Sequence, residues 1–249
     1  VLNSLLRISN IDVYVTGSNS KFLSSDIVTE FRGRGDEIRI YPLSFAEFYA
    51  AFDGDYEDSS KYQRTPLKLN EIYYAPGKFS QGLDIPSNST AISYNPDFFK
   101  EVINSKLYTI DLWLKLGSQN KWGFILGIDN GSINGFVLRF NGTNENRGIE
   151  YGILTSYIGS IFNKIPFPAD GQFHHLAISC DGVTTRLFID GIISGTTGSP
   201  SIVFPNSRFT IGGRENITGE ESALIIDELR ISNIARWTSN FTPPTKPYV

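Results

Sequence analysis

The sequence has 249 residues, of which 40% are hydrophobic and only 19% are charged. Its formal net charge is −4, and its 22 Lys and Arg residues form no basic stripe that could neutralise a run of phosphates. These figures exclude a strongly basic nucleic-acid-binding protein, so we expect no nucleic-acid partner. The aromatic content of 13% and the 23 Gly residues favour strands and tight turns, and we predict a mainly β fold.

The first fifth of the chain has a strand and helix pattern. Ile11–Val15 reads as a buried strand, and the polar loop Thr16–Ser20 follows at its carboxyl end. A short helix and a second extended segment lead to Pro42. Ser44 and Glu47 then fit a capping box at the start of FAEFYAAF, which predicts a helix there. The order indicates a short α/β segment.

About residues 2–50 resemble the second half of the nucleotide-binding domain in a bacterial and archaeal family of AAA-type ATPases. The resemblance implies a loop at Thr16–Asn19 that senses a γ-phosphate, and an arginine, Arg32 or Arg34, that faces a neighbouring nucleotide. The phosphate-binding pattern G-x-x-x-x-G-K-[ST] is missing, because the Gly77–Lys78 pair is followed by Phe. We therefore expect this segment not to hydrolyse ATP alone, and we expect no nucleotide cofactor.

From Phe52 onward, segments with a period of two alternate with short turns. Tyr108–Leu116, YTIDLWLKL, places Ile110, Leu112 and Leu114 on one face. Seven further strand candidates follow in the order WGFILGID, GFVLRFNG, GIEYGILT, FHHLAISCDG, TTRLFIDG, RFTIGGR and ALIIDELRIS. Asp-Gly, Asn-Gly and Gly-Gly pairs between them supply the positive φ angles of tight connections. The pattern predicts an antiparallel β-sandwich.

Four of these segments occur in an order that closely resembles the laminin-G-like and pentraxin-like branch of the concanavalin A-like lectins and glucanases. They are TIDLWLKL, QFHHLAISCDGVTTRLFIDGIISGT, FTIGGR and IIDELRISNIAR. The resemblance covers Phe52–Tyr248 and implies a jelly-roll sandwich. The stretch FDGDYEDSSKYQ resembles the opening region of that family, so the seam between the two parts falls between about Ala46 and Asp53. We assign residues 1–50 to a truncated AAA-ATPase-like segment and residues 51–249 to a laminin-G-like domain.

An acidic turn after the seam suggests a calcium site. Asp53, Asp55, Glu57 and Asp58 form an oxygen-rich cluster, and Ca²⁺ accepts carboxylate, carbonyl and water ligands in loops. The laminin-G-like resemblance implies a structural Ca²⁺ between the opening region and the last strand, which brings Asp227 near Asp53 or Asp58. We therefore predict Asp53, Asp58 and Asp227 as metal ligands. The alternative is a solvated acidic turn in which Asp227 accepts hydrogen bonds from backbone N–H groups.

A sugar site usually combines an aromatic face with a few amides and charges directed at hydroxyl groups. Five residues in or beside loops at the edge of the predicted sandwich fit this description: Trp122, Asn141, Tyr151, Tyr157 and Arg214. For each of them the alternative is ordinary packing in the core or on the surface.

The histidines and carboxylates argue against catalysis. His174 and His175 are adjacent in a predicted strand and point to opposite faces, so they cannot share one metal. We predict that one ring is buried and the other lies at the surface, with a general base as the alternative. No carboxylates have the E-x-D-x-x-E spacing that would place a glycan-cleaving set on one face, and Asp227 and Glu228 point to opposite sides. We expect no enzyme activity.

Three features bear on location. No apolar run approaches the roughly 20 residues that a membrane-spanning helix needs, so we expect no membrane insertion. The opening VLNSLLRISN lacks the features of a signal peptide, and without an initiating Met we expect the natural N-terminus to lie upstream, the alternative being an intracellular chain. The final ARWTSNFTPPTKPYV resembles the tail of laminin-G-like modules in phage structural proteins. Together with the lectin-like domain it favours an extracellular, cell-surface or virion location.

The sequence therefore predicts a non-catalytic binding module whose partner is a glycan or a surface protein. One alternative is a structural or adhesion component of a phage virion or surface assembly without a sugar site. The other is a fragment of an AAA-type ATPase fused to a lectin-like domain, which would need a missing half to bind nucleotide.

Overall fold

The computed structural model describes residues 47–68, 71–86, 92–117, 123–129, 135–141, 148–153, 160–199, 201–214 and 223–248. The chain separates into two units, residues 1–44 and residues 45–249, and every described residue belongs to the second unit. Residues 1–46 of the predicted α/β segment, with its polar loop and its arginines, lie outside the described residues.

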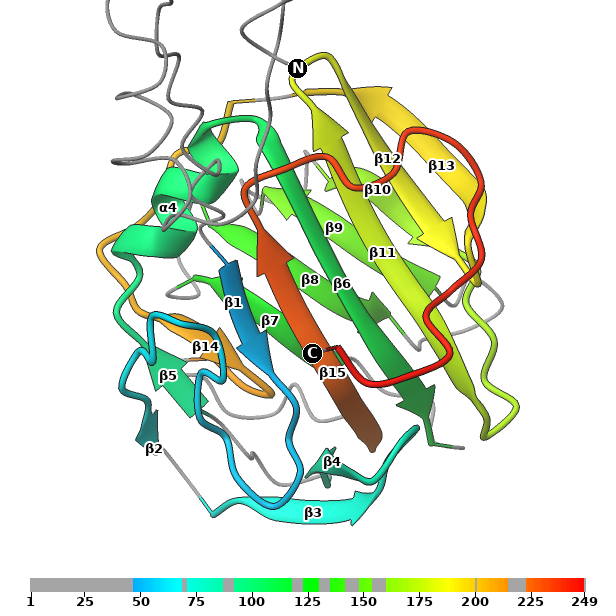
Figure 1. Ribbon diagram of the computed structural model, residues 1–249. Helices are drawn as coiled ribbons and strands as arrows, with labels where there is room; N and C mark the ends of the chain where they lie inside the picture. Colours follow the sequence, from blue (N-terminus) through cyan, green and yellow to red (C-terminus); the bar gives the residue numbers. More distant parts are fainter. Residues whose placement is uncertain are drawn as a thin grey trace, which may run out of the picture. The chain divides into compact units, whose positions relative to one another are not determined.

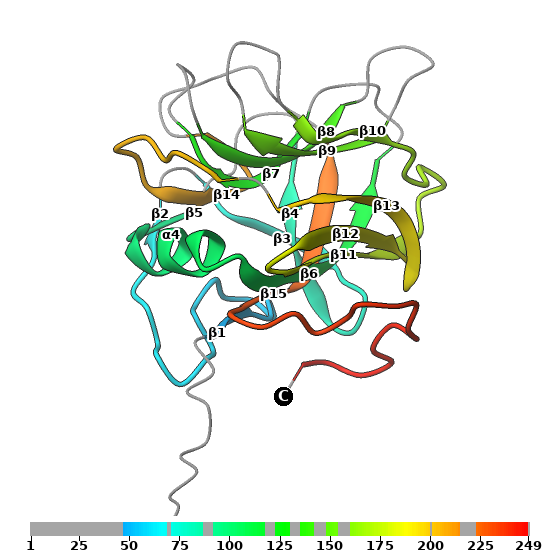
Figure 2. The same cartoon turned by 90° about the horizontal axis from the view of Figure 1, so that it is seen from above.

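The described residues form two antiparallel sheets that enclose a hydrophobic core (Figure 2). Sheet A consists of β1 (Glu47–Ala50), β3 (Tyr73–Pro76), β4 (Gln81–Ile85), β6 (Leu107–Leu116), β11 (Phe173–Asp181), β12 (Thr184–Ile189), β13 (Ile192–Gly198) and β15 (Leu224–Ser232). Sheet B consists of β2 (Leu67–Lys68), β5 (Ile92–Tyr94), β7 (Gly123–Ile128), β8 (Phe136–Asn141), β9 (Gly148–Ile153), β10 (Ser160–Ile165) and β14 (Phe209–Ile211). The predicted mainly β sandwich is confirmed.

The strand order interleaves distant parts of the sequence. Sheet A runs β13-β12-β11-β6-β15-β4-β3, and β1 also pairs with β15 (Figure 1). Sheet B runs β10-β9-β8-β7-β14-β5-β2. The single described helix, α4 (Asp97–Asn104), joins β5 to β6 and buries Phe99, Val102 and Ile103. It is too short to cross a membrane, and no helix of the described part of the chain meets that requirement.

The central strand β6 follows its predicted alternation. Ile110, Leu112 and Leu114 lie in the core, whereas Asp111 and Trp113 point to the outer face of sheet A, the face directed away from the core. Asp111 and Trp113 are nevertheless buried, so another segment must cover this part of the outer face.

The helix predicted from the capping box at Ser44 is wrong from Glu47 onward. Glu47–Ala50 is β1, which pairs with β15 in antiparallel register. Phe48 and Ala50 enter the core, which is the period of a strand and not of a helix. Residues 47–50 therefore belong to the sandwich and not to the preceding segment. The burial of two apolar side chains and the ladder to β15 outweigh the local capping signal.

An aromatic cluster lies where β1, α4 and β14 meet. The rings of Phe99 and Phe209 stack with centroids 3.6 Å apart, and Phe48 meets Tyr94 edge to face at 4.9 Å. All four rings are buried. This cluster joins the first described strand to sheet B through the core.

The segment 233–248, here called the C-terminal strap, crosses the outer face of sheet A (Figure 1). Trp237 and Phe241 stack on each other at 3.9 Å, and both meet the ring of His175 edge to face. The strap also packs on the β12–β13 turn, where Phe241 donates a backbone hydrogen bond to Gly191. Gly191 has a φ of +77°, and a Cβ there would lie 2.0 Å from the carbonyl oxygen of Phe241, so only glycine fits.

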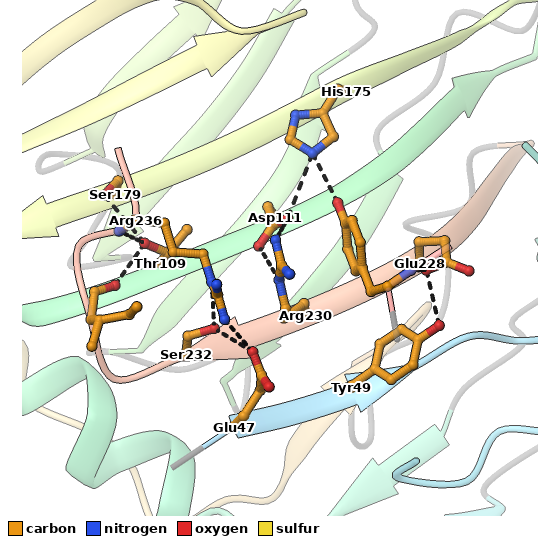
Figure 3. A network of polar contacts seen from close by, with 12 residues as sticks. Glu47, Tyr49, Thr109, Asp111, His175, Ser179, Glu228, Arg230, Ser232 and Arg236 are labelled. Carbon is orange, nitrogen blue, oxygen red and sulfur yellow. Dashed lines mark hydrogen bonds and ion pairs between the residues drawn. The ribbon is translucent and has the colours of Figure 1, made fainter. Parts of the chain in front are cut away.

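A buried polar network holds the strap (Figure 3). Asp111 accepts two hydrogen bonds from Arg230, at 3.1 and 2.9 Å. The hydroxyl of Tyr248 lies 2.9 Å from Nε2 of His175, and its ring packs on the Arg230 guanidinium at 3.9 Å. Glu228 accepts a hydrogen bond from the Tyr248 backbone at 2.6 Å. The strap thus ties together strands from both halves of sheet A.

Candidate functional site

Three of the five predicted sugar ligands, Asn141, Tyr151 and Arg214, belong to strands of sheet B or follow one of them. Trp122 and Tyr157 lie outside the described residues. Asn141 is the last residue of β8, and its side chain is not among those described. Tyr151 is fully buried in the core, with its hydroxyl 2.5 Å from that of Tyr108. Tyr151 therefore has no face to offer a sugar, and its assignment as a ligand residue is corrected to a core residue.

Arg214 belongs to a buried ion pair. Its Nε lies 2.9 Å from Oδ2 of Asp129, and the two side chains are only 7% and 3% exposed. On neighbouring strands of the same sheet, Arg139 and Glu150 form a second pair at 2.7 Å, also buried. Both pairs satisfy charges that would be costly to leave alone. Arg214 thus has a structural role in the described part of the chain.

Asp58 does not fit the predicted role of a metal ligand. Its Oδ1 accepts backbone hydrogen bonds from Tyr49 at 3.2 Å and Ser60 at 3.0 Å. Its Oδ2 is 2.7 Å from a guanidinium nitrogen of Arg64, and the carboxylate is buried. A cation would have to displace this arginine. The segment 58–64 is irregular, so no regular spacing in the sequence indicated this pair.

The charge of Asp53 acts on Asp227 at the point where the pairing partner of β15 changes. One edge of β15 pairs first with β4 and then with β1. On the other edge, the ladder between β15 and β6 is interrupted after Asp227, and Glu228 has a φ of +55°. Oδ2 of Asp227 accepts hydrogen bonds from the backbone of Lys78 at 2.6 Å and Phe79 at 3.1 Å. Oδ1 of Asp53 accepts one from the backbone of Gln81 at 3.0 Å.

The second oxygen of Asp227 is the unusual feature of this junction. Oδ1 is buried and has no hydrogen-bond partner among the described residues. Burial, together with the negative charges of Glu228 and Asp53, outweighs the backbone hydrogen bonds from Phe79 and Lys78 and raises the pKa of Asp227 to about 6. A cation beside Asp227 and Asp53 would satisfy this oxygen and offset the repulsion. The described residues contain no group of three or more His, Cys, Asp or Glu side chains placed to hold a metal, so carbonyl or water oxygens would have to complete the shell.

The two histidines behave as predicted, one buried and one at the surface. His175 is buried beneath the strap. His174 lies between two carboxylates, with Nδ1 2.6 Å from Asp190 and Nε2 3.1 Å from Asp170. A neutral imidazole carries one N–H, so it can donate to only one of them. The geometry therefore favours the protonated ring.

We expect stability to fall when His174 loses its proton. Partial burial lowers the pKa of His174, but the hydrogen bonds to Asp190 and Asp170 outweigh it, and the net shift is upward from 6.5. The stabilisation is complete below pH 6.5 and disappears as the pH rises through the higher folded pKa. Urea unfolding measured between pH 5 and 9 should show this loss. The variant His174→Gln should be less stable at pH 5 and lack this step, and an unchanged profile would contradict the assignment.

The neighbouring carboxylates of Asp227 and Glu228 both accept hydrogen bonds from other parts of the sandwich. Asp227 holds the β3–β4 turn, and Glu228 accepts hydrogen bonds from the Tyr49 hydroxyl at 2.9 Å and from the backbone of Tyr248. Burial raises the pKa of Glu228. Through these hydrogen bonds the two carboxylates attach the β3–β4 turn, β1 and the C-terminal strap to β15.

Comparison with known families agrees with both resemblances. A sequence profile described as the concanavalin A-like lectin/glucanases superfamily matches residues 86–239. A profile of an AAA domain matches residues 1–49.

Two curated relatives match parts of the chain. An uncharacterized protein of Haemophilus influenzae is 46% identical over 95 residues, which are 37% of this chain and 22% of that protein. The uncharacterized protein MJ1544 of Methanocaldococcus jannaschii is 46% identical over 43 residues, 17% of this chain and 10% of that protein. The chain therefore spans less than a quarter of the length of either relative.

Several solved structures share the fold. Domain 4 of AbnA, a GH43 extracellular arabinanase from Geobacillus stearothermophilus in complex with arabinotriose, has a TM-score of 0.53 and 21% identity over 74% of this chain and 90% of that domain. The binding domain of Paraclostridial Mosquitocidal Protein 1 has a TM-score of 0.60 and 12% identity over 77% and 49%. The binding domain of botulinum neurotoxin serotype D has a TM-score of 0.56 and 13% identity over 77% and 47%.

Proposed function

Since this chain belongs to the concanavalin A-like lectin/glucanases superfamily, we propose that its sandwich is a non-catalytic binding module for a carbohydrate or a cell-surface protein. The observation that carries the proposal is the match, over about three quarters of the chain, to solved domains whose names describe binding: one holds arabinotriose, and others are toxin binding domains. Such a module acts outside the cell, on a cell surface or on a virion.

The engaged carboxylates support a role without covalent chemistry. Glycan hydrolysis needs one carboxyl group to donate a proton and a second to act as nucleophile or base. In the described part of the sandwich, Asp58, Asp111 and Glu150 pair with arginines, and Glu228 holds the strap. The AAA match at residues 1–49 overlaps the described sandwich only at residues 47–49 of β1. Its contribution would be tested by nucleotide binding of the complete natural protein.

A glycan array tests the proposal. The full chain should be retained by a defined glycan, and the signal should saturate with protein concentration. Silence across the array, combined with binding to intact cells or to purified virion proteins, would favour the adhesion role without a sugar site. Silence in all three assays would remove the proposal.

We further propose that Asp227 and Asp53 hold a structural Ca²⁺ ion. The buried, unpartnered Oδ1 of Asp227 and the adjacent Asp53 carboxylate support it, whereas Asp58 is committed to Arg64. The ion would neutralise this junction of β1, β4 and β15 and stabilise it.

Calcium should therefore raise the stability of the chain. At a Ca²⁺ concentration of 100 times the dissociation constant, the free energy of unfolding should rise by about 2.7 kcal/mol. Thermal unfolding with Ca²⁺ and with EDTA measures this difference. Asp227→Asn should abolish the response. Asp55→Asn, in the same acidic turn but exposed, is the matched control and should retain it. Equal unfolding temperatures with Ca²⁺ and EDTA would exclude the ion.

A further inference from the structure

The strands β3 and β4 lie at one end of sheet A (Figure 1). At this end a row of side chains crosses the outer face of the sheet. Strand register places one residue from each of five neighbouring strands side by side: Tyr73, Asp84, Ile225, Lys115 and Phe173. The neighbours of these residues along β4, β6 and β15 point into the core, so the row points outward. We call these five residues the cross-strand row.

The cross-strand row is accessible, unlike the rest of this face. Tyr73 is 48% exposed, and the other four residues are partly exposed. The adjacent row on the same face, with Trp113 and His175, is buried beneath the strap and the β3–β4 turn. The covering segments therefore end before the cross-strand row.

The polar groups of the row make few contacts with the part of the chain that the structure describes. Within the described residues, the Asp84 carboxylate has no hydrogen bond or ion pair, and Lys115 makes only a cation–π contact, 5.5 Å from the centre of the Phe173 ring. Partial burial raises the pKa of Asp84, and the charge of Lys115 across the strand lowers it. A hydrogen-bond acceptor, the Asp84 carboxylate, and a donor, the Lys115 ammonium group, therefore lie between the two aromatic side chains of the row.

The spacing of the row fits a chain and not a single sugar ring. Neighbouring strands lie about 4.8 Å apart, so the four intervals from Tyr73 to Phe173 span roughly 19 Å. Aromatic rings at both ends can stack on apolar sugar faces, while Asp84 and Lys115 can bond hydroxyl groups between them. One positive and one negative charge give the row no net charge, which favours a neutral ligand over an anionic one.

From this arrangement we propose that the cross-strand row is a binding platform for an extended, neutral oligosaccharide or polysaccharide chain. The proposal deepens the binding function proposed above and rests on it. It places the ligand on the outer face of sheet A, away from sheet B and beside the buried row that contains Trp113 and Asp227.

Affinity gel electrophoresis of the full chain tests the platform. The probes are soluble neutral polysaccharides, namely hydroxyethyl cellulose, arabinan and galactomannan, with dextran sulfate as the anionic comparison. The wild type should be retarded by at least one neutral polymer, also in high salt and in EDTA. Tyr73→Ala and Phe173→Ala should each weaken binding about tenfold. Tyr62→Ala, a tyrosine that is 42% exposed outside the row, is the matched control and should bind as the wild type does. Far-UV circular dichroism confirms that each variant is folded.

The outcomes separate the two proposals. If a neutral polymer retards the wild type and the row variants equally, the platform is wrong but the binding function stands. If only dextran sulfate retards the chain and salt abolishes the effect, the preference for neutral ligands and the platform are both wrong. If no polymer and no array glycan binds, the platform is wrong and so is the carbohydrate form of the proposed function. This is also the result expected if the ligand is a surface protein.

Discussion

Replacing Asp111 by alanine should destabilise the sandwich by about 3–5 kcal/mol. Asp111 is fully buried and accepts both hydrogen bonds of the Arg230 guanidinium, while Nε2 of His175 lies 3.6 Å away. Its loss leaves the largely buried guanidinium of Arg230 without a counter-charge. It also removes the carboxylate of the polar network that holds Tyr248. The midpoint of urea unfolding, followed by far-UV circular dichroism, measures the effect.

Two variants show whether the buried charge is the cause. Ser179→Ala, on the same face of sheet A, removes only the neutral contact to Thr109 at 3.2 Å and should cost about 1 kcal/mol. The double variant Asp111→Leu/Arg230→Met removes both charges and should recover most of the stability lost by Asp111→Ala. A double variant that is less stable than the single one would show that packing, and not the unpaired arginine, decides the loss.

The same substitution tests the attachment of the strap. Tyr248 reaches the network through its hydroxyl at His175 and its ring on Arg230. Without Asp111 the strap should loosen, which would expose Trp237 and its stacked partner Phe241 to water. Tryptophan emission should therefore shift to longer wavelength before global unfolding. Coincident fluorescence and circular dichroism transitions in the variant would show that the strap stays docked.

The strands that the sequence predicts share a strong local signal. In β6, alternating apolar residues such as Leu112 and Leu114 point to the core, and Asp-Gly pairs give the turns at Gly182 and Gly191 their positive φ angles. β13 carries no such signal, because its polar and glycine-rich sequence lies at the edge of sheet A and is defined by its pairing with β12. The helix α4 has a local signal of its own, because Phe99, Val102 and Ile103 have the spacing of one helix face.

The candidate sites were less predictable because they depend on contacts between distant residues. Asp111 and Arg230 are 119 residues apart, and no spacing indicates that they pair. Tyr151 lies in a predicted strand beside a predicted loop, and its position on β9 points it into the core, where it meets Tyr108. The cross-strand row is likewise a property of register: its members lie on five strands, and only the order of sheet A brings them together.

The second large effect is expected at the start of the sandwich. Phe48→Ala should cost about 3–5 kcal/mol, because the ring is fully buried and meets Tyr94 at 4.9 Å, Phe99 at 5.3 Å and Phe209 at 6.3 Å. The cavity would open where sheet A, α4 and sheet B share the core. Urea unfolding of the full chain, followed by near-UV circular dichroism, reports the loss of this aromatic cluster.

The neighbouring residue provides the control that distinguishes a strand from a helix. Tyr49 points to the outer face, where its hydroxyl donates to Glu228, so Tyr49→Phe should cost only about 1 kcal/mol. Alternation of a large and a small effect at adjacent positions is the signature of β1. If the capping box at Ser44 instead directed a helix through this stretch, Phe48 would not be anchored against β14 and both substitutions would have small effects. The ratio of the two losses thus decides whether the sandwich begins at Glu47 or after it.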